Sequence, residues 1–240
     1  MKRILIVAII LAVYSTTCFA ESFTIHSDVS FGMSMNEVLK AEQDAGFSAK
    51  IERTDEADTY NCQSSHQSSY VKVSGKIAGK NGASIDYHFD NSEKLQSAIY
   101  ILAASSNSGE YTSIREALIK KYGEPNTEIS EVYHAYLKPC VYSHFDWANY
   151  YYNQENYKRV GYSCSIDYYY NDSWLLTQDD GSYILVTGIE AKESITGKGG
   201  ITFVLTTIGY QRFTGDEIKE VQSQFESDVE EYENQLNNDL

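Results

Sequence analysis

Proline, tryptophan and cysteine are scarce in this chain of 240 residues, which contains 2 Pro, 2 Trp and 4 Cys. So few prolines exclude a proline-rich linker, and no long Gly/Ser tract or short repeat is present. Common catalytic motifs are missing too, since neither G-x-S-x-G nor a P-loop occurs. The segment Ser69-Tyr70-Val71-Lys72 matches S-x-x-K, but the S-D-N and K-T-G motifs that accompany it in enzymes are missing. The sequence therefore contains no recognised catalytic motif.

Basic residues are also in short supply, with 19 Lys and Arg against 34 Asp and Glu and a formal net charge of −15. Taken as a whole, so acidic a chain repels phosphate backbones and anionic membranes. We therefore predict that nucleic acid is not a partner, and that the partner is a protein of unknown identity. The simplest role for the excess acidic residues is solubility.

The first 20 residues have the three parts of an export signal. Lys2 and Arg3 are followed by an apolar run over 4–13 and by the small-x-small cleavage site Cys18-Phe19-Ala20. The apolar run is too short to span a bilayer. We predict export to the periplasm or the medium, with cleavage near Ala20–Glu21 and no membrane span in the mature chain.

Two alternatives for this segment stay open. It could remain as a membrane anchor, although Ser15-Thr16-Thr17 interrupts the apolar run before it reaches about 18 residues. Cys18 could instead be lipidated, but a lipobox needs a Leu-like residue where Ser15 stands. We therefore favour the free exported form.

Three cysteines remain after cleavage: Cys62, Cys140 and Cys164. Three pairings are possible, and so is a fully reduced chain. Cys164 lies within a strand pattern and suits a buried position, whereas the other two lie in loop-like sequence. A possible Cys62–Cys140 disulfide would tie the two halves of the chain together and is the pairing that we favour.

Histidines are few, and their spacing does not favour a metal. His134, Cys140 and His144 could together supply three ligands, but closed zinc sites use tighter Cys and His clusters. We therefore predict no metal and no cofactor.

Apolar spacing predicts an alternation of helices and strands. Helices are expected at about 35–45, 110–122 and 216–236, and the capping boxes Ser34–Glu37 and Thr214–Glu217 start the first and the last. Period-two patterns predict strands at 49–53, 70–77, 84–90, 95–102, 160–168, 174–177, 183–189 and 201–210, with a hairpin turn at Asp180-Gly181. In the strand at 84–90, Ile85 and Tyr87 are expected to point inward and Asp86 and His88 outward, which gives a sheet with one wet face.

These elements predict an α+β protein: antiparallel sheets with helices packed on one face, in helix–strands–helix–strands–helix order. The expected organisation is a signal peptide (1–20), an N-terminal extension (21–30), two helix-plus-strands halves (31–106 and 107–213) and an acidic C-terminal helix (214–240).

Two segments carry a resemblance to known exported proteins. The first is Phe31-Gly32-Met33-Ser34-Met35-Asn36-Glu37-Val38, and the second is Leu118-Ile119-Lys120-Lys121-Tyr122-Gly123-Glu124-Pro125. Together they resemble the repeat of β-lactamase inhibitor proteins and of BamE (SmpA/OmlA) outer-membrane assembly lipoproteins. The resemblance implies small helices packed on one face of an antiparallel sheet. It carries over no functional residue.

Tyrosine is the abundant residue, with 21 copies, and many of them cluster between 142 and 170. Neighbouring strand residues alternate between faces, so these rings cannot all be buried on one face. Alternation places Val160 and Tyr168 inward. We predict that exposed aromatic residues of this cluster bind a partner, namely Trp147, Tyr150, Tyr152, Tyr157 and Tyr169.

The function predicted from these features is that of an exported, non-enzymatic protein-binding module with a Tyr-rich sheet face. Two alternatives remain: an envelope-assembly factor of the BamE kind, and an exported hydrolase with an unrecognised site.

Overall fold

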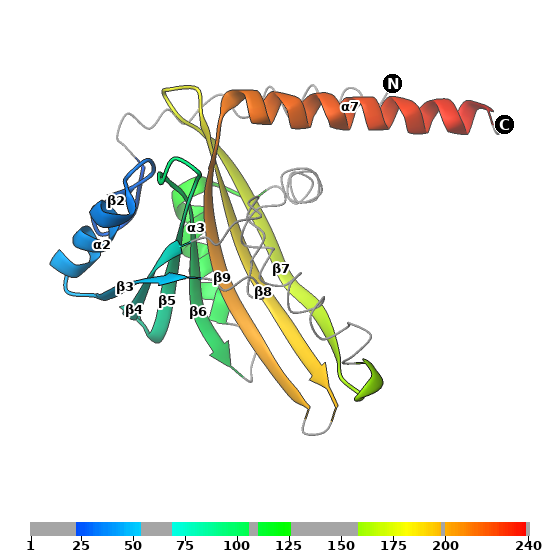
Figure 1. Cartoon of the computed structure of the whole chain (residues 1–240). Coiled ribbons are helices and arrows are strands. Elements are labelled where there is room, and N and C mark those ends of the chain that lie inside the picture. Colours follow the sequence, from blue (N-terminus) through cyan, green and yellow to red (C-terminus); the bar gives the residue numbers. More distant parts are fainter. Residues whose placement is uncertain (1–22, 54–68, 106–109, 126–157, 198–199, 239–240) are drawn as a thin grey trace.

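The computed structural model describes residues 23–53, 69–105, 110–125, 158–197 and 200–238. The predicted signal peptide lies outside these residues. Figure 1 shows how the elements are arranged. The strands are β1 (Thr24–His26), β2 (Val29–Ser30), β3 (Ser48–Arg53), β4 (Ser69–Ile77), β5 (Lys80–Phe89), β6 (Leu95–Ser105), β7 (Ser163–Thr177), β8 (Tyr183–Thr196) and β9 (Ile201–Phe213), and the helices are α2 (Met35–Asp44), α3 (Glu110–Tyr122) and α7 (Gly215–Asn238).

Seven of the strands form one antiparallel sheet in the order β3-β4-β5-β6-β9-β8-β7, while β1 and β2 pair separately. Most neighbours in the sheet follow one another in the chain, but β6 pairs with β9, and this contact joins the two runs of strands. The strands expected at 160–168 and 174–177 merge into one long strand, β7, which begins only at Ser163. The hairpin turn at Asp180-Gly181 joins β7 to β8, as predicted.

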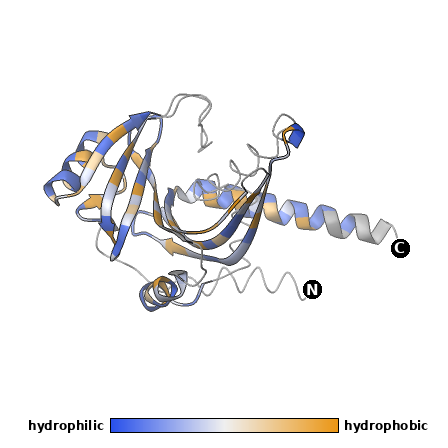
Figure 2. Ribbon diagram, turned by 90° about the horizontal axis from the view of Figure 1, so that it is seen from below, coloured by the Kyte–Doolittle hydropathy of each residue, from blue (hydrophilic) through white to orange (hydrophobic). Residues whose placement is uncertain are grey.

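The sheet is curved, and α2 and α3 lie on its convex side (Figure 2). Alternate residues of all the central strands point to this side and form the main core with Val38 of α2 and with Tyr111 and Leu118 of α3. The buried residues that the seven-stranded sheet contributes to this core are Val71, Val73, Ile77, Ala83, Ile85, Tyr87, Leu95, Ala98, Tyr100, Leu102, Trp174, Leu176, Ile184, Val186 and Ile208. The largest apolar cluster therefore lies between the sheet and these two helices.

The opposite, concave face is also largely buried. Ile99, Ile189, Ala191 and Leu205 form a second apolar cluster there. Near one end of this face, Ile218 and Val221 of α7 pack against Leu185 and Phe213. The sheet therefore does not have the single wet face that its alternation predicts.

The α+β class is compatible with this structure, but the predicted arrangement is wrong. The described residues form one seven-stranded sheet with three helices, and two strands precede the first helix, so the order is not helix–strands–helix–strands–helix. The helices do not share one face either, because α7 contacts the face opposite to α2 and α3. Local sequence signals position each helix along the chain, but they do not specify the side of the sheet on which it packs.

Both predicted capping boxes lie at helix starts. The Ser34 amide donates to the Glu37 carboxylate at 2.7 Å, and this contact lowers the pKa of Glu37. At the start of α7, the Thr214 amide donates to Glu217 at 2.7 Å, and the Glu217 amide donates back to the Thr214 hydroxyl at 3.2 Å. Each pair satisfies backbone donors that the first helical turn leaves open.

Candidate binding surface

The predicted site residues fall only partly within the described structure. Trp147, Tyr150, Tyr152 and Tyr157 lie outside the described residues, as do Cys62 and Cys140 of the favoured disulfide. Tyr169 lies on β7, and 46% of its surface is exposed. Cys164 is buried on the same strand, as its strand pattern predicts. Of the five aromatic residues predicted to bind a partner, only Tyr169 therefore lies in the described part of the chain.

Tyr169 belongs to a run of three exposed tyrosines. Tyr168 pairs with Ala191 and Tyr170 with the next residue of β8, Glu190, so Tyr169 is the extra residue of a β-bulge. The bulge breaks the period-two alternation after Tyr168, so Tyr168 and Tyr170 lie on opposite sides of the sheet. Tyr168 is 42% and Tyr170 36% exposed. Tyr168 precedes the bulge and stays on the side of Cys164 and Ile166, but it is exposed, so the inward position predicted for it is wrong. Val160, also predicted inward, precedes the strand and is exposed.

Tyr170 is held in place by α3. Its ring lies 5.3 Å from the Tyr111 ring, centroid to centroid, and the Arg115 guanidinium lies over it at 5.9 Å. Arg115 in turn donates to Asp172 at 2.7 Å, and this ion pair raises the pKa of Arg115. The contacts fix one end of the tyrosine run against a buried polar network.

The same network anchors the start of α3 to the sheet. The Tyr111 hydroxyl donates to Asp172 at 3.1 Å, and the Tyr111 amide donates to the fully buried Glu190 at 3.0 Å. The Tyr111 side chain lies directly over Gly188, where any Cβ atom would overlap the tyrosine hydroxyl. Gly188 is therefore required for this close approach of helix and sheet.

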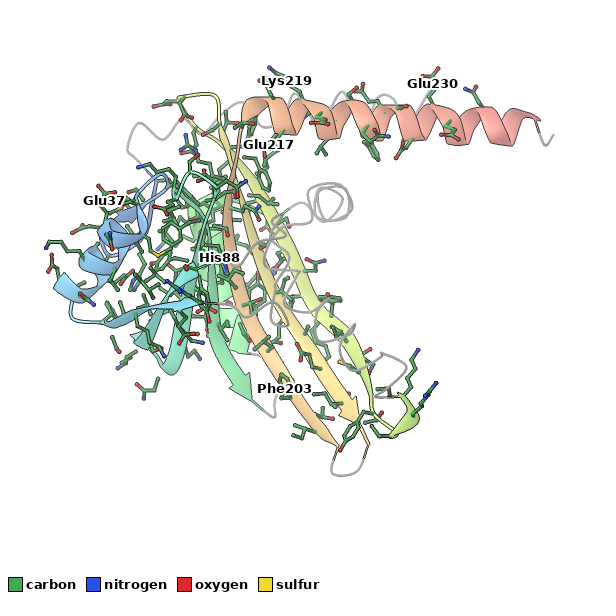
Figure 3. The ribbon with its side chains drawn as sticks, viewed as in Figure 1. Glu37, His88, Phe203, Glu217, Lys219 and Glu230 are labelled. Atoms are coloured by element: carbon green, nitrogen blue, oxygen red, sulfur yellow. The ribbon has the colours of Figure 1, made fainter. Side chains whose placement is uncertain are left out.

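The concave face carries polar groups that sequence reasoning assigned to solvent. Asp86 and His88 lie on this side of β5, as expected from the alternation, and the Tyr70 ring stacks on His88 at 5.6 Å (Figure 3 labels His88). Burial raises the pKa of Asp86 to about 6, although Lys72, its cross-strand neighbour, acts in the opposite direction. Burial lowers the pKa of His88 to about 4. The period-two pattern identified the residues of this face but could not show that Asp86 and His88 are partly buried there.

Several buried hydroxyls share this face. Ser97, Ser173 and Thr207 are almost fully buried, and their hydroxyls make no hydrogen bond among the described residues. Glu193 lies on the same face, and burial raises the pKa of its carboxyl to about 7. The concave face thus combines aliphatic side chains with polar groups that are removed from water.

A third polar cluster joins β1, α2 and β5. The Glu42 carboxylate is fully buried, and it accepts a hydrogen bond from the Tyr87 hydroxyl at 2.5 Å and another from His26 Nδ1 at 2.9 Å. The Ser27 hydroxyl lies 3.3 Å from that same nitrogen. A nucleophile–histidine–acid triad needs the hydroxyl and the acid on opposite ring nitrogens. This cluster therefore fixes the β1–β2 hairpin on α2 and does not have the geometry of a triad.

Comparisons with protein-family models, with curated proteins and with solved structures find no match for this chain. Within the described ranges, no three His, Cys, Asp or Glu side chains lie close enough together to hold a metal ion. Among the same residues, no helix combines the length and the apolar composition needed to cross a membrane.

Proposed function

We propose that this chain is an exported, non-enzymatic protein-binding module, and that it contacts its partner through the tyrosine-rich part of β7 and the segment before it. The observation that carries the proposal is the run Tyr168–Tyr170, three neighbouring tyrosines that are all exposed on the outermost strand of the sheet. Tyrosine is favoured at protein interfaces because its ring supplies a large contact area and loses little rotamer entropy.

The geometry around the run supports this proposal. The bulge at Tyr169 presents rings in more than one direction, and the α3 network holds Tyr170 before any partner arrives. A surface that is ordered in advance loses less conformational entropy on binding. The other predicted contacts, Trp147, Tyr150, Tyr152 and Tyr157, precede β7 in the chain and remain part of the proposal.

Among the described residues, no observation favours the two alternatives. The Ser27–His26–Glu42 cluster has the wrong geometry for a hydrolase triad, and the resemblance to BamE and β-lactamase inhibitor proteins stays a prediction.

The proposal is tested in two steps. A photo-crosslinking amino acid at position 169, introduced into the full-length chain in its native host, should capture a specific protein. The same amino acid at position 51 is the control, because Ile51 is 43% exposed on β3 at the opposite edge of the sheet. The captured protein is then purified, and its affinity is measured by calorimetry.

Alanine at Tyr169 should weaken that binding by more than about 1 kcal/mol, as expected of an interface hot spot. Tyr150→Ala, Tyr152→Ala and Tyr157→Ala extend the test, and Ile51→Ala should bind normally. Equal capture at positions 169 and 51, or wild-type affinity for all four tyrosine variants, would remove the basis for the proposal.

A further inference from the structure

The far end of β7, β8 and β9 extends beyond the rest of the sheet. The last described pair between β6 and β9 is Ser105 with Val204, whereas β9 continues to Ile201 and pairs with β8 as far as Ile195. Figure 1 shows these three strands reaching past β6, away from α7. We call this end the arm tip and define it as residues 158–165, 194–197 and 200–202.

The arm tip exposes aliphatic side chains beside cations. Val160 is 63% and Ile201 60% exposed, the highest values among the exposed large hydrophobic residues of the described chain. Lys158 and Arg159 directly precede Val160 and are exposed as well. No Asp or Glu occurs in 158–165 or in 194–202, although the whole chain carries a formal charge of −15. The tip is therefore locally basic and apolar within an acidic protein.

The two loops of the arm tip are packed against each other. The Tyr162 ring lies so close to Gly197 that a Cβ atom there would be 2.6 Å from it. The hydroxyls of Ser163 and Thr196 are 2.5 Å apart. These contacts fix the tip, so its exposed side chains are presented by an ordered element.

A strongly acidic element, α7, lies at the other end of the sheet (Figure 1). Helix α7 contains eight acidic residues and one lysine. Figure 3 shows Glu217, Lys219 and Glu230 on α7 at one end of the molecule and Phe203 toward the other. The 13 residues of β9 separate the two ends by roughly 40 Å, several times the Debye length of about 8 Å in physiological salt. Repulsion between α7 and a surface that touches the tip is therefore screened.

We propose that the arm tip docks on an anionic lipid surface. Exposed aliphatic side chains enter the boundary between headgroups and acyl chains, and neighbouring Lys and Arg side chains attract lipid phosphates. The tip has both features, and it has no carboxylate to oppose them. This contact uses residues other than the tyrosine run, and it does not depend on the proposed protein partner.

The test is co-sedimentation of the mature protein with vesicles of equal parts phosphatidylglycerol and phosphatidylcholine, and with pure phosphatidylcholine vesicles as the neutral reference. The wild type should bind the anionic vesicles preferentially. Lys158→Glu combined with Arg159→Glu should reduce the partition coefficient about tenfold or more, and Val160→Ser combined with Ile201→Ser should reduce it about fivefold. Matched controls are Lys40→Glu with Lys76→Glu for charge and Ile51→Ser for the aliphatic change, and these should bind as the wild type does.

A second readout does not depend on loss of binding. The emission of tryptophan in Ile201→Trp should shift to shorter wavelength with anionic vesicles and stay unchanged with neutral ones, because the side chain leaves water. Equal binding to both vesicle types, or tip variants that bind as well as the controls, would overturn the proposal. So would self-association without vesicles that the tip variants abolish, because the tip would then bind the acidic α7 of a second copy.

Discussion

The convex and concave faces of the sheet are both largely buried, but they differ in whether their buried polar groups form hydrogen bonds. On the convex face, Glu42, Asp172 and Glu190 each accept hydrogen bonds from identified donors. On the concave face, the hydroxyls of Ser97, Ser173 and Thr207 are buried without a hydrogen bond among the described residues. Two faces that are buried to a similar extent therefore differ in what their polar groups do. Only on the convex face do these groups anchor the described helices to the sheet.

Local sequence signals predicted the helices well. The capping boxes at Ser34 and Thr214 lie at helix starts, and Gly46 and Gly123 have the positive φ expected of residues that end helices. These signals are short-range, because each involves backbone groups a few residues apart. Helix bounds therefore follow from the sequence to within about two residues. Strand bounds follow less closely, since β8 continues to Thr196 beyond its predicted end at 189, and β1 and β2 were not predicted.

Non-local features could not be predicted. The β6–β9 pairing and the face chosen by α7 depend on contacts far apart in sequence. The bulge at Tyr169 shifts the register by one residue, which no alternation pattern reveals in advance. Of the candidate site, the sequence identified Tyr169, and it missed the support from Arg115 and Tyr111 because these residues lie on a helix some 50 positions earlier.

The largest expected effect comes from disturbing the helix contact on the convex face. In Gly188→Ala, the new methyl group overlaps the Tyr111 side chain, so α3 must shift, and we expect a loss of about 3 kcal/mol in the free energy of unfolding. The control is Gly75→Ala, whose Cβ meets only the Phe47 ring edge at 3.2 Å. Urea unfolding measures both. Equal losses would mean that α3 does not rest on Gly188.

The second-largest effect on stability is expected at the buried carboxylate of α2. Glu42→Gln replaces a carboxylate that accepts hydrogen bonds from Tyr87, His26 and Ser27 by an amide, whose NH2 group opposes one of the donors, and it should cost about 2 kcal/mol. Asp44→Asn on the same helix is the control, because its ion pair with Lys40 is exposed and should contribute less than about 0.5 kcal/mol. If the two variants unfold at the same urea concentration, Glu42 does not anchor the β1–β2 hairpin.

The concave face should respond to pH. Because the pKa of Asp86 is raised from 3.8 to about 6, its stabilising contribution is complete below about pH 4 and is lost as pH rises through 6. Asp86→Asn cannot ionise, so it should become more stable than the wild type by about 2 kcal/mol at pH 7, and the gain should vanish near pH 4.

His88 has the opposite dependence on the same face. Its pKa is lowered from 6.5 to about 4, so its contribution is present above about pH 6.5 and is lost as pH falls through 4. His88→Gln should therefore unfold less readily than the wild type at pH 4 and show no such gain at pH 7. Urea midpoints across this range measure both variants. Parallel pH profiles for wild type and variants would show that neither side chain is removed from water.

The smallest expected effect compares two neighbouring threonines of β9, one on each face. Thr206 points to the convex side, where its hydroxyl donates to Glu190 at 3.4 Å, and Thr207 points to the concave side between Ile101 and Ile189. Both are buried to within 1% of full coverage. Valine has nearly the same shape as threonine, so each substitution removes a hydroxyl without opening a cavity.

Thr206→Val should lower the free energy of unfolding by about 1 kcal/mol, because it leaves a buried carboxylate with one donor fewer. Thr207→Val should leave the free energy of unfolding unchanged or raise it by up to about 1 kcal/mol, since a buried hydroxyl without a partner is itself unfavourable. A clear loss of stability in Thr207→Val would show that its hydroxyl has a hydrogen-bond partner in solution, and the contrast between the two faces would then fail at this position.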